Sequence, residues 1–310
     1  MKVTKKVSQI LANYESDNIG TKANLARILM QGKLRGSGKL IILPVDQGFE
    51  HGPARSFAMN ADAYDPQYHF SLAIDAGLSA YAAPLGMLEA GADSYIGAIP
   101  LILKMNSANS LASHINGYDQ AITASVDDAL RLGCSAIGFT IYPGSCNCFA
   151  MMEEIRELAS EAKAKGLAVV IWSYARGDKI SKEGETAMDI IGYAAHMAAL
   201  MGAHIIKVKL PSSHLEQAEA KQVFQANDIA ITSAADRVKE VVRSCFNGRR
   251  LVVFSGGGKK GDDALFADVR AIRDGGGTGS IVGRNSFQRS REDALVMFDK
   301  MINILLGRVD

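Results

Sequence analysis

Eight short apolar runs, separated by amphipathic stretches, restrict the folds open to this chain of 310 residues more than any other feature. Most of the runs are apolar throughout, as strands covered on both faces of a parallel sheet must be. The runs comprise residues 39–45, 78–84, 100–106, 135–142, 167–174, 204–210, 250–256 and 279–285. Eight strands that alternate with helices predict a closed parallel (β/α)8 barrel, an α/β fold. An open doubly wound sheet is disfavoured, because no G-x-G-x-x-G motif opens a helix directly after an early strand.

Helix-end signals between the runs support this alternation. One helix is expected to open with Asp65 as its N-cap and Pro66 in its first turn, and another is expected to open at Ser125. The helices expected between and after the strands occupy residues 65–77, 125–133, 148–166, 185–202, 261–277 and 291–307. Two more helical stretches, 7–14 and 22–32, precede the first strand. We therefore expect an N-terminal helical extension over residues 1–38, which covers the barrel bottom or meets a partner subunit, and a barrel domain over residues 39–310.

The charge balance excludes several classes of partner. The chain has 34 basic and 33 acidic residues and a net charge of +1, so no basic excess indicates binding to nucleic acid or to an anionic membrane. It has no apolar run long enough to cross a bilayer and no signal-peptide core, which predicts a soluble cytoplasmic protein. Cys146 and Cys148 are interpreted as free thiols. The six histidines are scattered without metal-type spacing, so we expect no metal and no cofactor.

The sixth run, "HIIKVKL", carries two lysines on one face of a buried strand. Lys207 and Lys209 alternate with apolar residues, and burying a lone ammonium is costly. Burial and a like charge both lower the pKa of a lysine, and a neutral amine can attack a ketone to form a Schiff base. The alternative is that the two lysines pair structurally with acids such as Asp46 or Glu50. We favour the interpretation that one of the two lysines is a catalytic nucleophile.

Further polar residues stand where other strands end, the place where barrel enzymes carry their active residues. "LPVDQGFEHGP" contains Asp46, Glu50 and His51, and "IWSYARG" contains Trp172 and Tyr174 on one face. Asp46 is expected to be functional, and a tyrosine hydroxyl at the rim can exchange protons with a substrate. His51 is a candidate substrate contact.

Lys104, in the third run, has two readings that the sequence leaves open. A lysine among apolar residues can snorkel from the rim of the barrel. It can also pair with Asp46 across the barrel.

Two glycine-containing loops indicate a phosphate site. The seventh run ends in "FSGGGKK" and the eighth in "IVGRN". Loops after strands seven and eight often bind phosphate in barrels through backbone N–H groups and a short helix. Glycines 256–258 allow the backbone to approach the phosphate oxygens, and Arg284 adds charge-assisted hydrogen bonds. "DGGGTGS", residues 274–280, precedes a strand, so we expect it at the opposite end.

Taken in order, "LPVDQGFEHGP", "LILKMN", "AIGFTIYPGS", "VVIWSYARG", "IIKVK", "SGGGKK" and "IVGRN" resemble the motifs of the archaeal-type class I fructose-1,6-bisphosphate aldolases. The resemblance runs from about residue 39 to residue 290. It implies a (β/α)8 barrel, metal-independent aldol cleavage, and a large homo-oligomer, often a decamer. Many archaeal members have histidine where this chain has Gln47, and a bacterial subgroup has glutamine. The segment "PSSHLEQAEAKQVF" after the sixth strand matches no family pattern.

The resemblance also implies residue roles. Lys207 matches the Schiff-base lysine, with Lys209 helping to keep it neutral, and Tyr174 and Asp46 match the residues that manage proton transfers. The matched substrate-binding positions are Trp172, Ser255, Gly256, Gly257, Gly283 and Arg284. The expected substrate is fructose 1,6-bisphosphate. A related Schiff-base synthase or thiolase of the same superfamily, or a barrel that only binds a sugar phosphate, remains an alternative.

Overall fold

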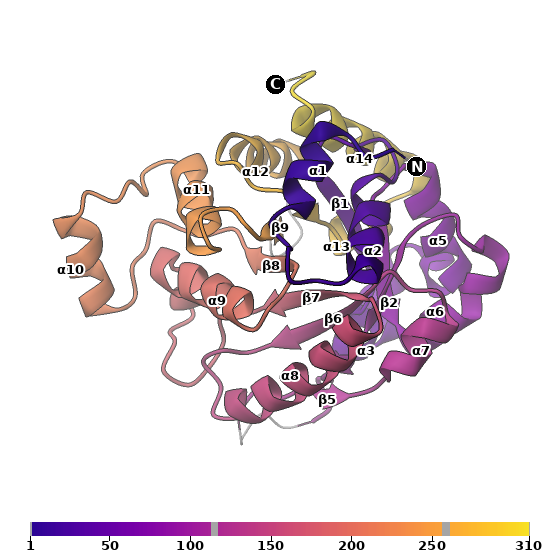
Figure 1. The fold of residues 1–310 in the computed structure, drawn as a ribbon, viewed down its shortest axis with the longest axis horizontal. Helices are drawn as coiled ribbons and strands as arrows, with labels where there is room; N and C mark the ends of the chain where they lie inside the picture. Colours follow the sequence, from indigo (N-terminus) through magenta and orange to yellow (C-terminus); the bar gives the residue numbers. More distant parts are fainter. Residues whose placement is uncertain (1, 113–116, 256–260, 310) are drawn as a thin grey trace.

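The computed structural model describes residues 2–112, 117–255 and 261–309, and eight parallel strands close into a barrel within them (Figure 1). Each predicted run contains one strand, so the predicted (β/α)8 barrel is confirmed. The strands, in their order around the barrel, are β1 (Leu40–Pro44), β10 (Gly279–Ile281), β9 (Leu251–Ser255), β8 (Ile205–Lys209), β7 (Ala168–Ser173), β6 (Ala136–Ile141), β3 (Leu101–Lys104) and β2 (Ala80–Pro84). Two short strands, β4 (Asn106–Ser107) and β5 (Ala121–Ile122), pair separately and antiparallel.

Helices surround the barrel, and their capping signals act as predicted. The Asp65 side chain accepts a hydrogen bond from the backbone N–H of Gln67, and Ser125 forms a capping box with Asp128. The outer helices are α5 (Pro66–Asp75), α6 (Leu85–Gly91), α7 (Val126–Arg131), α8 (Cys148–Ala164), α9 (Met188–Leu200), α11 (Ala234–Ser244), α12 (Asp262–Asp274) and α14 (Arg291–Leu305). Short helices at the upper end are α3 (Gln47–His51), α4 (Pro53–Phe57) and α13 (Arg284–Phe287).

The strands divide the buried apolar residues into two cores because successive side chains alternate between the faces of a strand. One core fills the barrel and includes Ile42, Val170, Ile205 and Val253. The other lies between the barrel and the outer helices and includes Ile206. On β8 the alternation puts Ile205 and Lys207 on the inner face, as the sequence predicts.

The first two helices cover the lower end of the barrel, which was one of the two places expected for them. They are α1 (Lys5–Leu11) and α2 (Ile19–Leu29), and they begin two or three residues before the predicted bounds because Thr4 and Asn18 cap them. Their buried side chains join the inner core of the barrel. The division of the chain at residue 38 stays a prediction.

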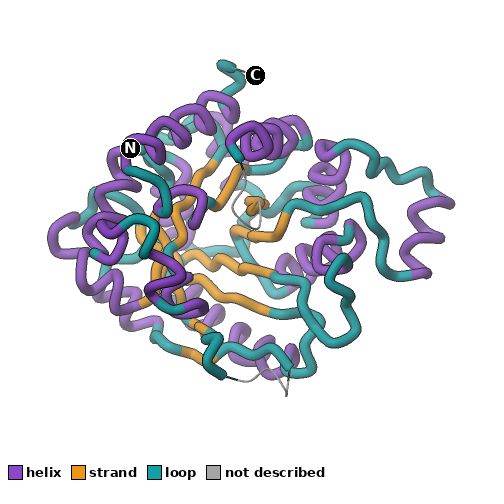
Figure 2. Tube along the Cα trace, turned by 180° about the vertical axis from the view of Figure 1, so that it is seen from behind, coloured by secondary structure: helices purple, strands orange, loops and turns teal. Residues whose placement is uncertain are grey.

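The sequence analysis identified no helix in the segment between β8 and β9, yet this segment contains two. Helix α10 (Ala218–Ala226) has no buried residue and extends away from the barrel (Figures 1 and 2). Helix α11 packs beside α9 and α12. Ser233 and Asp236 form a capping box at its start, a Ser-x-x-Asp signal that was present in the sequence.

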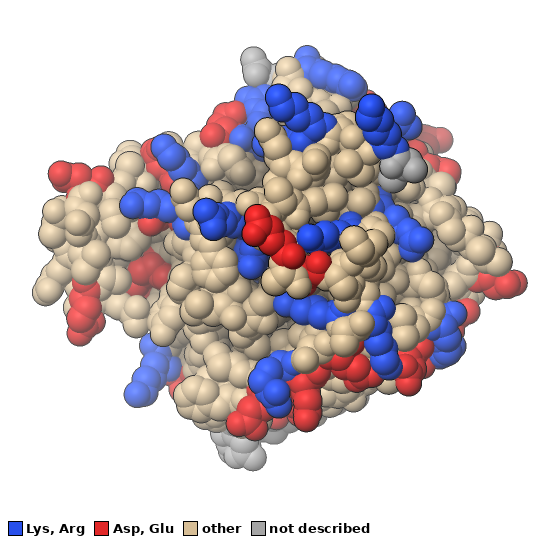
Figure 3. Space-filling view, in the orientation of Figure 1, with Lys and Arg blue, Asp and Glu red and all other residues tan. Residues whose placement is uncertain are grey.

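The surface agrees with the balanced charge of the chain. Basic and acidic side chains are interspersed over the face drawn in Figure 3. Across the part of the chain that the structure describes, no helix is long and apolar enough to cross a membrane.

Candidate active site

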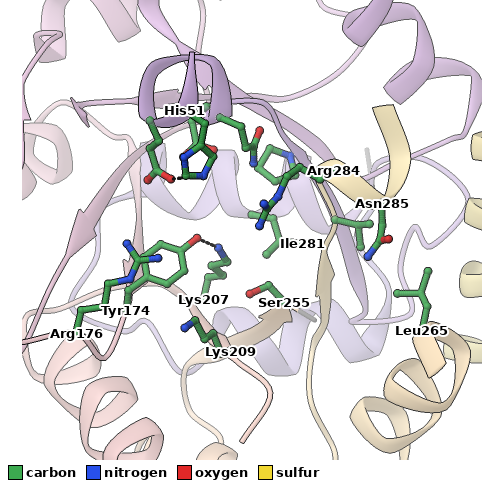
Figure 4. Close-up of a pocket in the computed structure, with 16 residues that line it drawn as sticks. His51, Tyr174, Arg176, Lys207, Lys209, Ser255, Leu265, Ile281, Arg284 and Asn285 are labelled. Atoms are coloured by element: carbon green, nitrogen blue, oxygen red, sulfur yellow. Dashed lines mark hydrogen bonds and ion pairs between the residues drawn. The ribbon is translucent and has the colours of Figure 1, made fainter. Parts of the chain in front are cut away.

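A cavity opens at the carboxyl ends of the strands, where the sequence predicts the active residues. It encloses about 780 Å³ of empty space, including its open mouth. Its walls come from β1, α3, the segment after β7, β8, β9, α12, β10 and α13. The residues that line it are Pro44, Asp46, Gln47, Glu50, His51, Tyr174, Arg176, Lys207, Lys209, Ser255, Leu265, Ile281, Val282, Gly283, Arg284 and Asn285 (Figure 4).

Lys207 lies at the base of this cavity, on the inner face of β8. Lys207 is 5% exposed, and its Nζ donates a hydrogen bond to the hydroxyl of Tyr174, which directly follows the neighbouring strand β7 (Figure 4). Burial lowers the pKa of Lys207 to about 7. The carboxylates of Asp46 and Glu50 oppose this change, whereas the charges of Lys104 and Lys209 add to it. A large fraction of the amine is therefore unprotonated near pH 7, as a nucleophile requires.

Tyr174 lies partly buried beside the amine. Its ring centroid lies 4.1 Å from the Nζ atom of Lys207. Burial raises the pKa of the Tyr174 hydroxyl well above its usual value, and the charges of Asp46 and Glu50 act in the same direction. The hydroxyl consequently keeps its proton, so it can donate that proton to an oxygen or carbon bound at Lys207.

The loop after β1 brings three ionisable groups into the cavity. Asp46 precedes the short helix α3, which carries Glu50 and His51. Burial and the charge of Asp46 raise the pKa of Glu50. Burial, followed by the charge of Arg284, lowers the pKa of His51. The Nε2 atom of His51 lies 3.6 Å from the Oε2 atom of Glu50. The surroundings therefore make Glu50 easier to protonate, and His51 harder to protonate, than the same side chains in water.

Lys209 is paired with an acid that the sequence analysis did not consider. Its Nζ atom lies 2.7 Å from Oε2 of Glu185, and Lys182 lies 3.0 Å from the other carboxylate oxygen. Glu185 was expected in the first turn of α9. It lies instead in a 3-10 turn, Gly184–Thr186, because Ala187 has an extended conformation and α9 begins at Met188. The structural pairing considered for this lysine pair therefore applies to Lys209, with Glu185 in place of Asp46 or Glu50.

Candidate phosphate-binding residues line one side of the cavity. Ser255 ends β9, Gly283 follows β10, and Arg284 begins α13 (Figure 4). A side chain at Gly283 has no room, because its Cβ would lie 2.8 Å from Nε2 of Gln47 and 3.0 Å from the carbonyl oxygen of Pro44. Gly256 and Gly257, two more predicted binding residues, lie outside the described residues.

Comparison with known proteins identifies the family. A model of the DeoC/LacD aldolases matches residues 40–289. The chain belongs to this aldolase family. It is 36% identical over 272 residues to the class 1 fructose-bisphosphate aldolase of Thermoproteus tenax, covering 87% of this chain and 90% of the relative. It is 34% identical over 312 residues to a probable class 1 fructose-bisphosphate aldolase of Chlamydia muridarum, covering 97% and 88%.

Solved structures agree with the sequence relatives. An archaeal fructose 1,6-bisphosphate aldolase matches with a TM-score of 0.73 and 35% identity over 87% of this chain and 94% of that chain. A structure of an archaeal fructose-1,6-bisphosphate aldolase with its catalytic lysine bound to the carbinolamine intermediate matches with a TM-score of 0.72 and 34% identity over 87% of this chain and 95% of that chain. The resemblance to archaeal-type class I aldolases is confirmed, and the protein is a lyase of this kind.

Arg176 is a cavity residue that the sequence analysis of this aldolase missed. It lies across the cavity from Arg284 (Figure 4). Its guanidinium carbon is 5.6 Å from the ring centroids of Tyr142 and Tyr174 and 5.7 Å from that of Tyr118. The signal was its position two residues after Tyr174, which puts both on one face of an extended chain.

Trp172 and Lys104 lie deeper than the substrate cavity. Trp172 is 1% exposed and is not among the lining residues, so its contact with substrate stays a prediction. Lys104 is 3% exposed and donates hydrogen bonds to Asn106, so it neither snorkels from the rim nor makes its hydrogen bonds to Asp46.

Proposed function

We propose that this aldolase reversibly cleaves fructose 1,6-bisphosphate through a Schiff base on Lys207. The observation that carries the proposal is the Lys207 amine, which is buried at the base of a cavity, hydrogen-bonded to Tyr174 and has a pKa of about 7. Relatives named as fructose-bisphosphate aldolases support the substrate. The proposal includes a role in glycolysis or gluconeogenesis, a cytoplasmic location and a large homo-oligomer, possibly a decamer.

The reaction begins when the neutral Lys207 amine adds to the ketone carbon and forms a carbinolamine. Loss of its hydroxyl as water, with a proton donated by Tyr174, leaves an iminium. The bond between the third and fourth carbons then breaks as a carboxylate, Asp46, accepts the proton of the hydroxyl on the fourth carbon. Glyceraldehyde 3-phosphate leaves, and the electron pair remains as an enamine. Protonation at carbon and hydrolysis release dihydroxyacetone phosphate and restore the amine.

The cationic side chains of Arg176 and Arg284 lie on opposite sides of Lys207, an arrangement that can bind a substrate with a phosphate at each end (Figure 4). Ser255, Gly283 and Arg284 would hold the ketone-side phosphate, and Arg176 would meet the other phosphate. A guanidinium binds phosphate through paired charge-assisted hydrogen bonds. The stacking of Arg176 among three tyrosine rings limits its motion before substrate arrives.

Borohydride trapping tests the proposal. The protein is incubated with dihydroxyacetone phosphate and reduced, and the adduct is located by intact mass and peptide mapping. We expect one adduct on Lys207, and we expect the Lys207→Ala variant to lose turnover and labelling. An adduct on Lys209 or Lys104 would move the site. No adduct, beside a labelled class I aldolase, would contradict the proposal.

Two further measurements address the alternatives. Substrate profiling with phosphorylated sugars and ketoacids separates this activity from that of a related synthase or thiolase. In residues 2–112, 117–255 and 261–309, no group of three His, Cys, Asp or Glu residues is arranged to hold a metal ion. The expectation of metal-independent catalysis is tested by assay after dialysis against a chelator, where full activity should remain.

A further inference from the structure

Lys104 is a second buried lysine inside the barrel. It ends β3, and its Nζ donates hydrogen bonds to the backbone carbonyl of Asn106 and, at 3.2 Å, to the Asn106 side-chain oxygen. The same Nζ lies 5.9 Å from the centroid of the Trp172 ring. An ammonium has three donors and no acceptor, so two oxygens and an aromatic face are suitable surroundings for its charged form.

The backbone of β6 fixes the orientation of the Asn106 amide. Its Nδ2 donates to the carbonyl oxygen of Thr140 at 2.8 Å, and its Oδ1 accepts from the N–H of Thr140 at 2.8 Å. Turning the amide over would set donor against donor and acceptor against acceptor. Asn106 is thus held with its oxygen toward Lys104. This favours an ammonium over a neutral amine at this position.

A glycine allows Trp172 to reach Lys104. Gly138 on β6 is paired in register with Lys104 on β3, and β6 lies between β3 and β7. A Cβ atom on Gly138 would lie 1.9 Å from the Trp172 ring. The ring therefore crosses over β6 where no side chain intervenes. Trp172 is itself paired in register with Lys207 on β8, so its strand links the surroundings of the two lysines.

The two lysines near Lys207 have different hydrogen-bond partners. Lys209 is neutralised by Glu185 at 2.7 Å, whereas the hydrogen-bond acceptors of Lys104 are both neutral oxygens. Burial lowers the pKa of Lys104 as it does that of Lys207, and the charges of Asp46 and Glu50 oppose this change at both lysines. At Lys104 the two Asn106 oxygens and the Trp172 ring also favour the charged form. Among the cations that lower the pKa of Lys207, Lys104 has a larger effect than Lys209. Like charges in a poorly hydrated interior strongly disfavour double protonation.

We propose that Lys104 is a positioning residue of the Schiff-base reaction: its ammonium, held by Asn106 and Trp172, keeps the Lys207 amine unprotonated for attack. This inference rests on the proposed function. It transfers to Lys104 the role that the sequence analysis gave to Lys209. Lys104 does not touch the substrate, because it lies outside the cavity lining.

The pH dependence of borohydride trapping tests this proposal. The initial rate of adduct formation on Lys207 with dihydroxyacetone phosphate is measured from pH 5.5 to 9.5. In the wild type the rate should rise with a midpoint near pH 7, the pKa of Lys207. In Lys104→Met the midpoint should rise by about one pH unit, which lowers the rate at pH 6 about tenfold. The rate at pH 9.5 should stay within about threefold of the wild type.

Three further variants separate charge from shape. Lys104→Gln removes the charge but keeps polar atoms for Asn106, so its midpoint should rise as in Lys104→Met, and it serves if the methionine variant fails to fold. Lys104→Arg keeps the charge and should keep the wild-type midpoint. Lys209→Met, whose partner is Glu185, should shift the midpoint less than Lys104→Met.

Each outcome decides the matter. An unchanged midpoint in the neutral Lys104 variants would overturn the proposal and leave the proposed function intact. Equal shifts in the arginine and glutamine variants would indicate a steric role and would also overturn it. A wild-type protein without any adduct would contradict the proposed function itself. Circular dichroism and thermal melting of every variant accompany the rates.

Discussion

The two ends of the barrel interior differ sharply in what they bury. At the lower end, α1 and α2 cover the strands with apolar side chains such as Val7 and Leu25, both fully buried. At the upper end the same strands surround Lys104, Lys207, Glu50 and their neighbours. Strand β8 reaches both ends, because His204 directly precedes it and Lys209, which lines the cavity, is its last residue.

The polar groups of the lower end are paired. His204 accepts a hydrogen bond from the backbone N–H of Val169 at 2.9 Å, and its other ring nitrogen lies 3.0 Å from Asp17. The hydroxyl of Tyr14 donates to the carbonyl oxygen of His204 at 2.8 Å. These hydrogen bonds connect the segment between α1 and α2 to the barrel.

The upper end contains buried polar atoms without hydrogen-bond partners among the described residues. They include Oε1 of Gln47, Oγ1 of Thr140, Nε1 of Trp172 and Oγ of Ser173. Each such atom costs stability, about 1–3 kcal/mol when it is fully desolvated. We infer that the two ends have different roles. The lower end contributes stability to the fold, and the upper end holds buried polar groups that lower stability but are available for catalysis.

Among the substitutions considered, Lys207→Met should have the largest effect, and it should change turnover rather than stability. Turnover of fructose 1,6-bisphosphate should fall at least about 10⁴-fold, because the amine that we propose as the Schiff-base nucleophile is gone. The free energy of unfolding should stay level or rise, since an apolar side chain replaces a buried amine. Steady-state assay and urea denaturation measure the two effects. More than 1% residual activity would contradict the site.

The same Tyr→Phe substitution at the upper and the lower end should change different quantities. Tyr174→Phe should lower kcat roughly 10²- to 10⁴-fold by removing the proposed proton donor, with little change in stability. Tyr14→Phe should lower the free energy of unfolding by about 1 kcal/mol, through the lost bond to His204, and leave kcat unchanged. Similar kinetic losses in the two variants would argue against separate roles for the ends.

Leu25→Ala tests the lower end by its packing. The Leu25 side chain is fully buried against the barrel strands, so the free energy of unfolding should fall by about 3 kcal/mol. At a temperature where the variant is folded, kcat and KM should match the wild type. Chemical denaturation and steady-state kinetics on one preparation provide both values. A change in kcat would mean that the two ends are coupled.

The pH dependence of stability should show the smallest effect. Burial lowers the pKa of His204 below 6.5, and its bond to Asp17 only partly opposes this change. The folded state therefore favours the neutral ring. Its contribution is fully present above pH 6.5 and is lost as the pH falls through the folded-state value. His204→Gln keeps a donor and an acceptor but does not titrate. Its melting temperature should fall less between pH 7.5 and 5 than that of the wild type, and parallel curves would contradict the assignment.

The sequence predicted the architecture because local patterns carry it. Apolar runs of strand length, and caps such as Asp65 and Ser125, act over a few residues and can be read without the fold. The same periodicity put Lys207 on the inner face of its strand. The helix that begins at Ala234 was not predicted, although its capping signal, Ser233 and Asp236, is present in the sequence. The information needed to predict this helix was therefore available without the fold.

The sequence by itself determined the barrel, the inward lysine and the end of the barrel at which the candidate active site lies. Only the tertiary structure decided what surrounds that lysine. Glu185 neutralises Lys209, Arg176 faces the cavity, and Asn106 holds Lys104 through the backbone of a neighbouring strand. These contacts join residues whose loops and strands meet only in the closed barrel. The charge on a buried lysine depends on such neighbours and on its distance from water, and neither can be read from spacing along the chain.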